Sequence, residues 1–136
     1  MSFVLDNSIA LAWCFEDEQT PWVMALLDRV VESGAVAPQL WPIEALNGLL
    51  TAERRGRIDR DKRARLVGLL RELPIRIDEE NSGRLWEAVT GLAERHRLTS
   101  YDACYLELAI RLGMKLATND KALIAAASDA GVLLRE

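Results

Sequence analysis

The sequence predicts an α/β protein, a three-layer α/β/α domain whose helices cover both faces of a central, mostly parallel sheet of four or five strands. Two observations predict this class. Short apolar segments, each the length of a buried strand, alternate with longer segments that carry helical start and stop signals. The alternation runs along the whole chain, and parallel strands need helical crossovers between them. We therefore expect residues 1–136 to form a single domain.

The first part of the chain supplies two predicted strands and three predicted helices. Thr20 and Pro21 combine a capping residue with proline at the first helical position, and Gly34 and Gly56 mark helix ends. The predicted strands are Phe3–Asp6 and Ala35–Pro38, and the predicted helices are Ile9–Phe15, Pro21 to about Glu32, and Trp41 to about Arg55.

The rest of the chain repeats the pattern. Asp59 is suited to cap a helix that Pro74 cannot continue, and Gly113 ends a later helix. The predicted strands here are Ile75–Asp78, Lys115–Thr118 and Val132–Leu134, and the predicted helices are Arg60 to about Leu73, Gly83–Arg95, Ser100–Leu112, and Asp120 to about Ser128.

Composition indicates a globular protein without a membrane span. The 136 residues are 50% hydrophobic and 28% charged, and no apolar run reaches the ~18–20 residues that a membrane span requires. The start MSFVLDNS lacks the basic and apolar segments of a signal peptide, so we expect a cytoplasmic location. Cys14 and Cys104 are far apart in sequence, and we expect reduced thiols in or near the core.

Basic residues are concentrated in one short stretch, although the formal net charge is −4. We call this stretch the basic cluster: Arg54, Arg55, Arg57, Arg60, Lys62, Arg63 and Arg65. The negative net charge argues weakly against nonspecific coating of nucleic acid. The cluster is either a solvated helix–turn–helix surface or a phosphate-contacting rim beside an acidic site.

The predicted helix that begins at Ser100 has an aspartate on its apolar side. Asp102 shares a face with Tyr105, Leu106 and Ala109, which lie three, four and seven residues further on. On this pattern, Glu107 and Arg111 face water on the other side and pair with each other. An unpaired carboxylate on a buried face costs several kcal/mol, so something must compensate Asp102.

Three further acids are predicted at the same edge of the sheet. Asp6 ends the first strand, Asp120 follows the fourth, and Glu44 lies in the first turn of the helix after Ala35–Pro38. Each has a structural alternative: Asp6 and Asp120 as N-caps, and Glu44 as a solvated first-turn residue. Four converging carboxylates would repel one another unless a cation lay among them.

A hard divalent cation fits such a group, because Mg²⁺ and Mn²⁺ prefer oxygen ligands and keep several waters. A metal would attract phosphate to the acidic pocket and activate water for attack on phosphorus. The sequence lacks the residues that other catalytic mechanisms need. The single His96 has no evident Ser or Cys partner, a zinc-type Cys/His cluster is missing, and no glycine-rich phosphate loop occurs.

A small residue, Gly48, is predicted beside Glu44. Glu44 shares its helix face with Asn47, Gly48 and Thr51, and the small Gly48 leaves room for another group to approach. The opposite face of this helix is apolar, and it carries Ile43, Leu46, Leu49 and Leu50.

Four stretches, in order along the whole chain, resemble the signature blocks of the PIN-domain ribonucleases, and within them the VapC-type toxins of toxin–antitoxin pairs. They are VLDNSIALAW at Val4–Trp13, WPIEALNGLL at Trp41–Leu50, LTSYDACYLELA at Leu98–Ala109 and LATNDKAL at Leu116–Leu123, of which the third is the most specific. The resemblance implies a PIN-like fold and a metal-dependent endoribonuclease, a hydrolase of RNA phosphodiester bonds.

The resemblance also implies site residues. Asp6, Glu44, Asp102 and Asp120 correspond to the family's acidic quartet, which holds Mg²⁺ or Mn²⁺, and Ser8 to its usual small hydroxyl residue. Thr118, Asn119 and Asn47 match polar neighbours of the acids. In the mechanistic hypothesis, Asp6, Asp102 and Asp120 hold the metal directly or through water. Glu44 orients or deprotonates the attacking water, and Ser8 supports a ligand or a water.

The partners that the resemblance implies are an RNA substrate, a second copy of the chain in a homodimer, and a cognate VapB-like antitoxin that offers an Arg to the acidic site. A different class remains open: a non-catalytic PIN-fold protein that binds RNA or a partner without cutting. A phosphatase is disfavoured because position 8 is Ser, where a second aspartate is needed. A phosphoacceptor receiver is disfavoured because Asp6 stands alone on its strand.

Overall fold

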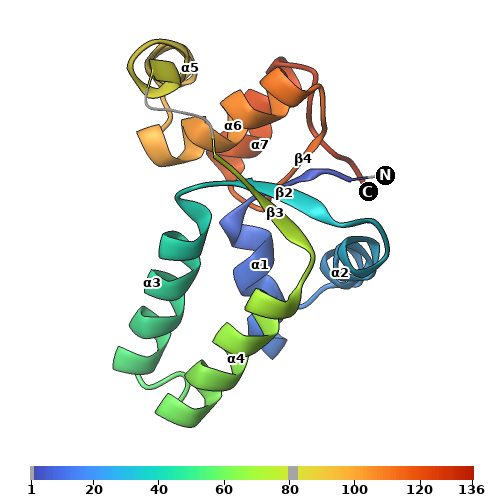
Figure 1. Cartoon of the computed structure of the whole chain (residues 1–136), viewed down its shortest axis with the longest axis vertical. Coiled ribbons are helices and arrows are strands. Elements are labelled where there is room, and N and C mark those ends of the chain that lie inside the picture. The colour runs from blue at the N-terminus through green and yellow to red at the C-terminus, as the bar shows by residue number, and fades with distance from the viewer. Residues whose placement is uncertain (1, 80–82) are drawn as a thin grey trace.

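The computed structural model describes residues 2–79 and 83–136. Strands and helices alternate as the sequence predicts (Figure 1). The strands are β1 (Val4–Leu5), β2 (Ala35–Pro38), β3 (Ile75–Asp78) and β4 (Leu116–Ala117). The helices are α1 (Asn7–Cys14), η1 (Glu16–Glu18, a 3₁₀ turn), α2 (Pro21–Ser33), α3 (Trp41–Arg54), α4 (Arg60–Glu72), η2 (Leu85–Val89, a π-helical turn), α5 (Thr90–His96), α6 (Ser100–Leu112) and α7 (Lys121–Asp129).

The four strands form one parallel sheet in the order β3-β2-β1-β4. The prediction of a central parallel sheet is therefore confirmed, at the lower of the two expected strand numbers. The predicted strand Val132–Leu134 contributes only a single parallel bridge, between Leu116 and Leu133. Its neighbour β4 has only two residues, so it offers the returning chain little backbone to pair with.

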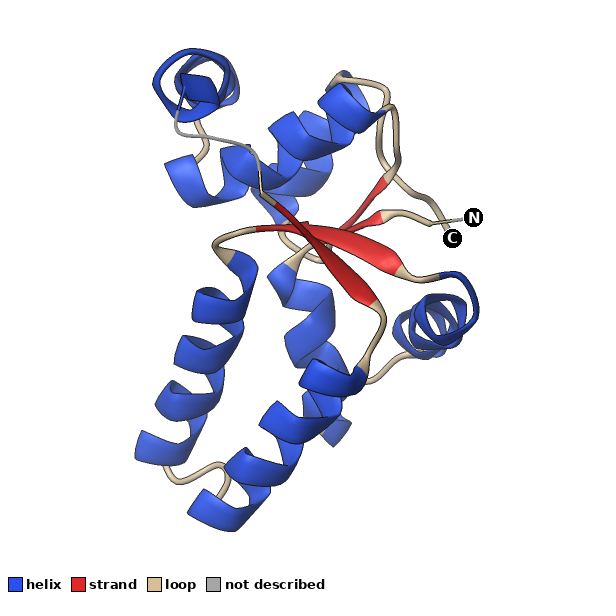
Figure 2. Ribbon diagram, viewed as in Figure 1, coloured by secondary structure: helices blue, strands red, loops and turns tan. Residues whose placement is uncertain are grey.

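Helices lie on both sides of the sheet (Figures 1 and 2). Helix α6 packs against β1, β2 and β4, and α7 packs against α6. Helices α1 and α2 lie on the opposite side, and α3 and α4 form a long antiparallel hairpin that points away from the sheet (Figure 1). This arrangement leaves the carboxyl ends of the strands beside the first turns of α1, α3, α6 and α7.

The local helix signals have the predicted effect. The Thr20 hydroxyl accepts a hydrogen bond from the backbone N–H of Val23 at 3.1 Å, and the Asp59 carboxylate accepts one from Lys62 at 2.7 Å. Helix α6 ends at Gly113, whose φ of 65° is the left-handed conformation that glycine adopts without strain.

One prediction on α6 is wrong. Glu107, expected to face water, is 7% exposed, although it pairs with Arg111 as predicted, with the guanidinium Nε donating to a carboxylate oxygen at 2.9 Å. The cause is tertiary: η2 and α5 pack over α6 and cover a second side of it. A helix period read from sequence identifies one buried face, and α6 has two.

The apolar face predicted for α3 is also partly wrong. Leu49 is fully buried, but Ile43 is 71% exposed and Leu46 is 41% exposed. The buried stripe of α3 runs instead through Trp41, Ala45, Leu49 and Ala52. Ile43 and Leu46 lie outside this stripe, on the exposed part of α3.

The predicted helix Gly83–Arg95 is irregular, since it begins with the π-helical turn η2 and continues as α5. The Thr90 hydroxyl donates to the Leu85 carbonyl at 2.9 Å across the widened turn. Cys14 and Cys104 are free thiols packed against the core, as predicted. No helix within residues 2–79 and 83–136 is long and apolar enough to span a membrane.

Candidate active site

The four predicted acids follow strand ends or lie in the first turns of helices. Asp6 directly follows β1, and Asp120 follows β4 after a short connection. Glu44 and Asp102 lie in the first turns of α3 and α6. Asp6 and Asp120 do cap their helices, accepting backbone hydrogen bonds from Ser8 and Leu123. Their structural role and their position at the site therefore coexist.

Asp6 is the most enclosed of the four acids, with 4% of its surface exposed. Its Oδ2 accepts hydrogen bonds from the Ser8 hydroxyl at 2.5 Å and from the Thr118 hydroxyl at 2.8 Å. Burial raises the pKa of Asp6, and these two hydroxyls partly oppose the rise. The hydroxyls thus hold one carboxylate oxygen in place on its inner side.

The same hydroxyls connect Asp6 to the start of α7. The Ser8 Oγ accepts from the backbone N–H of Asn119 at 2.9 Å, and the Thr118 Oγ1 accepts from that of Asp120 at 3.0 Å. Ser8 therefore contacts Asp6 directly, and its predicted role in supporting a metal ligand or a water stays a prediction. Because these bonds join segments from the two ends of the sequence, they fix Asp6 and the backbone of Asp120 relative to each other.

Glu44 is held by a residue on a different helix. The Tyr105 hydroxyl donates to Glu44 Oε1 at 2.7 Å, and Tyr105 itself is fully buried. Burial raises the pKa of Glu44, the Tyr105 hydrogen bond lowers it, and the charge of Asp6 raises it again.

Asp102 brings the four acids into one electrostatic group. Burial, followed by the charges of Asp120, Asp6 and Glu44, raises its pKa to about 6. Like charges raise a pKa in this way when they lie close together. The half-buried aspartate on the apolar side of α6 therefore lies at the rim of an acidic site rather than inside the core.

Basic side chains do not neutralise this site. None of the four acids forms an ion pair with a residue that the structure describes. Over the same residues, no group of three or more His, Cys, Asp or Glu side chains is arranged to hold a metal ion. The donor set itself, oxygen-only and anionic, fits a hard cation that retains several waters.

The space predicted beside Glu44 is occupied. A Cβ added to Gly48 would lie 2.6 Å from Cδ1 of Leu11, on α1. Gly48 therefore allows α1 and α3 to approach each other, and it leaves no opening for a ligand. Asn47 is exposed on the next position of the helix.

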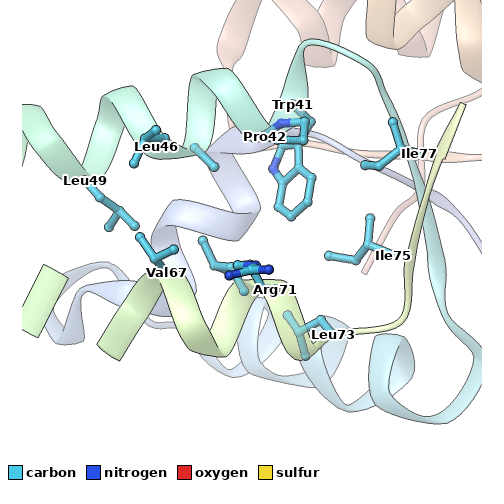
Figure 3. A pocket seen from close by; sticks show the side chains of 11 residues that line it. Trp41, Pro42, Leu46, Leu49, Val67, Arg71, Leu73, Ile75 and Ile77 are labelled. Carbon is cyan, nitrogen blue, oxygen red and sulfur yellow. The ribbon is translucent and has the colours of Figure 1, made fainter. Parts of the chain in front are cut away.

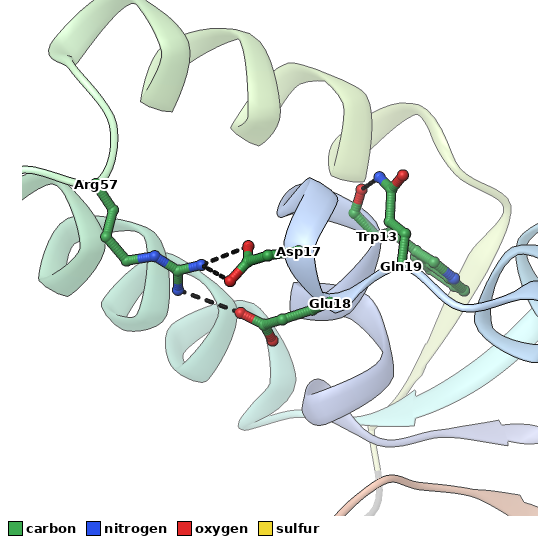
Figure 4. Close-up of polar contacts among 5 residues, drawn as sticks. All are labelled: Trp13, Asp17, Glu18, Gln19 and Arg57. Carbon is green, nitrogen blue, oxygen red and sulfur yellow. Dashed lines mark hydrogen bonds and ion pairs between the residues drawn. The ribbon is translucent and has the colours of Figure 1, made fainter.

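The basic cluster lies at the far end of the α3–α4 hairpin. Arg54 is about 15 Å from Glu44 along the axis of α3, at a rise of ~1.5 Å per residue. Arg57 pairs with Asp17 at 2.9 Å and with Glu18 at 3.2 Å, which ties the hairpin to η1 (Figure 4). This position favours a solvated helix–turn–helix surface over a rim beside the acids.

A small apolar cavity of about 230 Å³ lies between α3, α4 and β3 (Figure 3). Trp41, Leu46, Val67 and Ile75 line it, together with Arg71. It contains none of the four acids, so it is separate from the candidate active site.

Sequence reasoning missed the role of Tyr105. It assigned this residue to the buried face of α6, which is correct, but it gave the hydroxyl no partner. The signal was the residue type, because a tyrosine at a fully buried position needs a hydrogen-bond acceptor and a phenylalanine does not. Only the fold shows that the acceptor is Glu44, 61 residues away in sequence.

Together, the parallel sheet and the acids at its carboxyl edge, which form no ion pair among the described residues, define an α/β protein with an acidic site where its strands end. The PIN domain model matches residues 3–129, and the chain belongs to the PIN domain family. PIN domains are generally nucleases.

Solved structures agree with this fold. The crystal structure of PAE2754 from Pyrobaculum aerophilum is 25% identical in sequence with a TM-score of 0.72, and the match covers 93% of this chain and 84% of that one. The crystal structure of FitAcB from Neisseria gonorrhoeae is 17% identical with a TM-score of 0.66, and the match covers 94% of each chain. No match was found among curated proteins.

Proposed function

We propose that the protein is an endoribonuclease that hydrolyses RNA phosphodiester bonds with Mg²⁺ or Mn²⁺. The observation that carries the proposal is the electrostatic coupling of Asp102 to Asp120, Asp6 and Glu44, none of which has an ion-pair partner within residues 2–79 and 83–136. A protein gains nothing in stability from such a group, because each added negative charge makes the next more costly. A bound cation reverses that balance.

Asp6, Asp102, Asp120 and Glu44 are the residues that would hold the metal. When bound, the ion would stabilise the developing negative charge on the phosphate as a Lewis acid, and it would lower the pKa of a water molecule. The chain contributes orientation. Ser8 and Thr118 fix Oδ2 of Asp6, and Tyr105 occupies Oε1 of Glu44.

Glu44 is the residue that we assign to proton transfer. Its Oε2 is the oxygen that Tyr105 does not use, and its raised pKa makes it a stronger base than an ordinary glutamate. Oε2 would accept the proton of the attacking water, while the bond from Tyr105 keeps the carboxylate from rotating.

We further infer that the protein is the toxin of a toxin–antitoxin pair that acts in the cytoplasm as a homodimer and is inhibited by a VapB-like antitoxin. The resemblance of the four sequence stretches supports this inference. The unpaired acids add a physical reason, since an antitoxin arginine would meet carboxylates without an ion-pair partner among the described residues.

The test is cleavage of RNA by the parent protein and by Asp6→Asn, with Asp28→Asn as control. Asp28 is exposed on α2 and tests the loss of a charge elsewhere. We expect cleavage that requires Mg²⁺ or Mn²⁺ and stops with EDTA. Asp6→Asn should lower the rate by about a thousand-fold, the order of loss when one transition-state-stabilising group is removed, and Asp28→Asn should not.

Equal rates for Asp6→Asn and the parent would refute the site. RNA binding without any cleavage would support the alternative of a non-catalytic PIN-fold binding protein. For the toxin role, induced expression should arrest growth, and Asp6→Asn should relieve the arrest.

A further inference from the structure

A second cavity, of about 560 Å³, lies beyond the carboxyl ends of β2 and β3. Helix α6 forms one side of it, the connection from β2 to α3 forms another, and η2 forms a third. The residues that matter for its chemistry are Gln39, Leu40, Leu85, Ser100, Tyr101 and Cys104. None of the four acids lines it.

The cavity adjoins the acidic site through two elements. Ser100 and Tyr101 directly precede Asp102 on α6. On the other side, the carbonyl of Leu40 accepts the backbone hydrogen bond of Glu44 at 3.0 Å, so this wall lies one helical turn before Glu44. A phosphodiester at the acids would therefore have the cavity as its neighbour.

Helix α6 connects the two sites. Asp102 lies in its first turn, and Cys104, two residues further on, lines the cavity.

The lining suits a flat, partly polar ligand. Tyr101 is 62% exposed, which is unusual for an aromatic ring and leaves it available for stacking. Leu40 and Leu85 supply apolar contacts, and Gln39 and Ser100 supply groups that can donate and accept hydrogen bonds. The charged residues that line the cavity give a phosphate group no excess of positive charge, since they are Asp78, Glu79 and Glu107 against Arg84 and Arg111.

We propose that this cavity is a nucleobase subsite, in which a base next to the cleaved phosphodiester stacks on Tyr101. The proposal rests on the proposed ribonuclease function and names its substrate class: RNA with an unpaired nucleotide at the cleavage position. A paired base would have to leave its helix to enter, at a cost of a few kcal/mol. Stacking on aromatic side chains is how proteins usually hold unpaired bases.

The experiment combines protein and RNA changes. The cleavage site is first mapped on a short single-stranded RNA, and each nucleotide flanking it is then replaced in turn by an abasic one. The kcat/KM is measured for the parent, Tyr101→Ala, Tyr101→Phe and Ile110→Ala. Ile110 lies on the same helix, is 44% exposed and does not line the cavity.

We expect Tyr101→Ala to lower kcat/KM by about ten-fold, mainly through KM, because it removes one stacked base. Tyr101→Phe and Ile110→Ala should stay near the parent. One abasic position should weaken cleavage by the parent to a similar extent, and it should have little additional effect on Tyr101→Ala, since both changes remove the same contact.

Two results would overturn the proposal separately from the ribonuclease function. If Tyr101→Ala cleaves normally and stays as sensitive to abasic positions as the parent, no base enters, and the cavity becomes a candidate surface for a protein partner. If Tyr101→Ala loses equal activity on fully paired RNA, the ring contacts the backbone rather than a base. If the parent cleaves no RNA, the ribonuclease function itself fails, and the subsite fails with it.

Discussion

Helix α6 contributes one carboxylate to each of two groups of acids, and the protein compensates the charge of these groups in opposite ways. On one side, Glu107 and Asp78 are both bound by Arg111, at 2.9 Å and 2.7 Å. At its N-terminal end, Asp102 faces three further acids and no basic partner among the described residues. Both groups are partly or largely removed from water, so burial alone does not explain the difference.

The two groups differ in how their charge is compensated. In the Arg111 group, charge is neutralised by charge, and the two carboxylates raise the pKa of Arg111 through hydrogen bonds. At the Asp102 group, burial raises the pKa of Asp6, Glu44 and Asp102, and the charge of at least one neighbouring acid raises each pKa further. A protein retains such a destabilised group when a ligand compensates it.

Removing Arg111 should leave its carboxylates without that cation, as the acids around Asp102 are. We expect this change to cause the largest loss of stability. Arg111→Met keeps much of the side-chain length but leaves Glu107 and Asp78 without their shared cation. We expect a loss of about 3–5 kcal/mol in the free energy of unfolding, the usual cost of breaking a buried pair on one side. Urea unfolding followed by circular dichroism measures it.

The matched control is Arg65→Met, at an exposed position of α4, which should change stability by no more than ~0.5 kcal/mol. Equal stability of Arg111→Met and the parent would mean that the buried carboxylates need no cation. The contrast between the two sides of α6 would then be lost.

A smaller effect is expected from Tyr105→Phe, which removes only a hydroxyl. It should cost about 1–2 kcal/mol of stability, because a hydrogen bond to a carboxylate is lost. RNA cleavage should fall by about ten-fold, in kcat rather than KM, since Glu44 is then free to rotate.

The pH dependence of kcat distinguishes a Tyr105 that positions Glu44 from a Tyr105 that only stabilises the fold. The Tyr105 hydrogen bond lowers the pKa of Glu44, so its removal raises that pKa. Glu44 then loses its charged, base form at a higher pH, and the acidic limb of the kcat profile should move upward. Loss of stability with an unshifted limb would leave Tyr105 a structural residue only.

The sequence predicted the sheet and the position of the acids because both depend on local signals. The strand Ile75–Asp78 and the capping of α2 by Thr20 were correct to the residue. Asp6 and Asp120 were located correctly because an acid that ends a parallel strand must lie at the carboxyl edge of the sheet.

The errors have a common physical origin in tertiary packing. Glu107 is buried because η2 and α5 cover a second side of α6, which no period in the α6 sequence reveals. Gly48 seemed to leave room for a ligand, but Leu11 of α1 fills it. The Tyr105–Glu44 bond likewise joins two helices that are distant in sequence. Such features become visible only when the elements are packed together.

The smallest expected effect is a gain in stability when a negative charge is removed from the group of acids around Asp102. Asp102→Asn removes one charge from the acid group. Because the pKa of Asp102 is raised from 3.8 to about 6 in the folded protein, folding favours its protonated form. In metal-free parent protein, the stability from this group is present below about pH 4 and is lost as the pH rises through about 6.

Asp102→Asn should therefore match the parent near pH 4 and exceed it near pH 7, by about 1 kcal/mol after allowance for the half-exposed side chain. Thermal unfolding in EDTA at the two pH values measures the difference. Added Mg²⁺ should stabilise the parent and leave the variant nearly unchanged, because only the parent retains the complete acid group. If the variant is less stable than the parent at neutral pH without metal, the Asp102 carboxylate stabilises the fold. Repulsion among the acids at this edge would then not destabilise the protein.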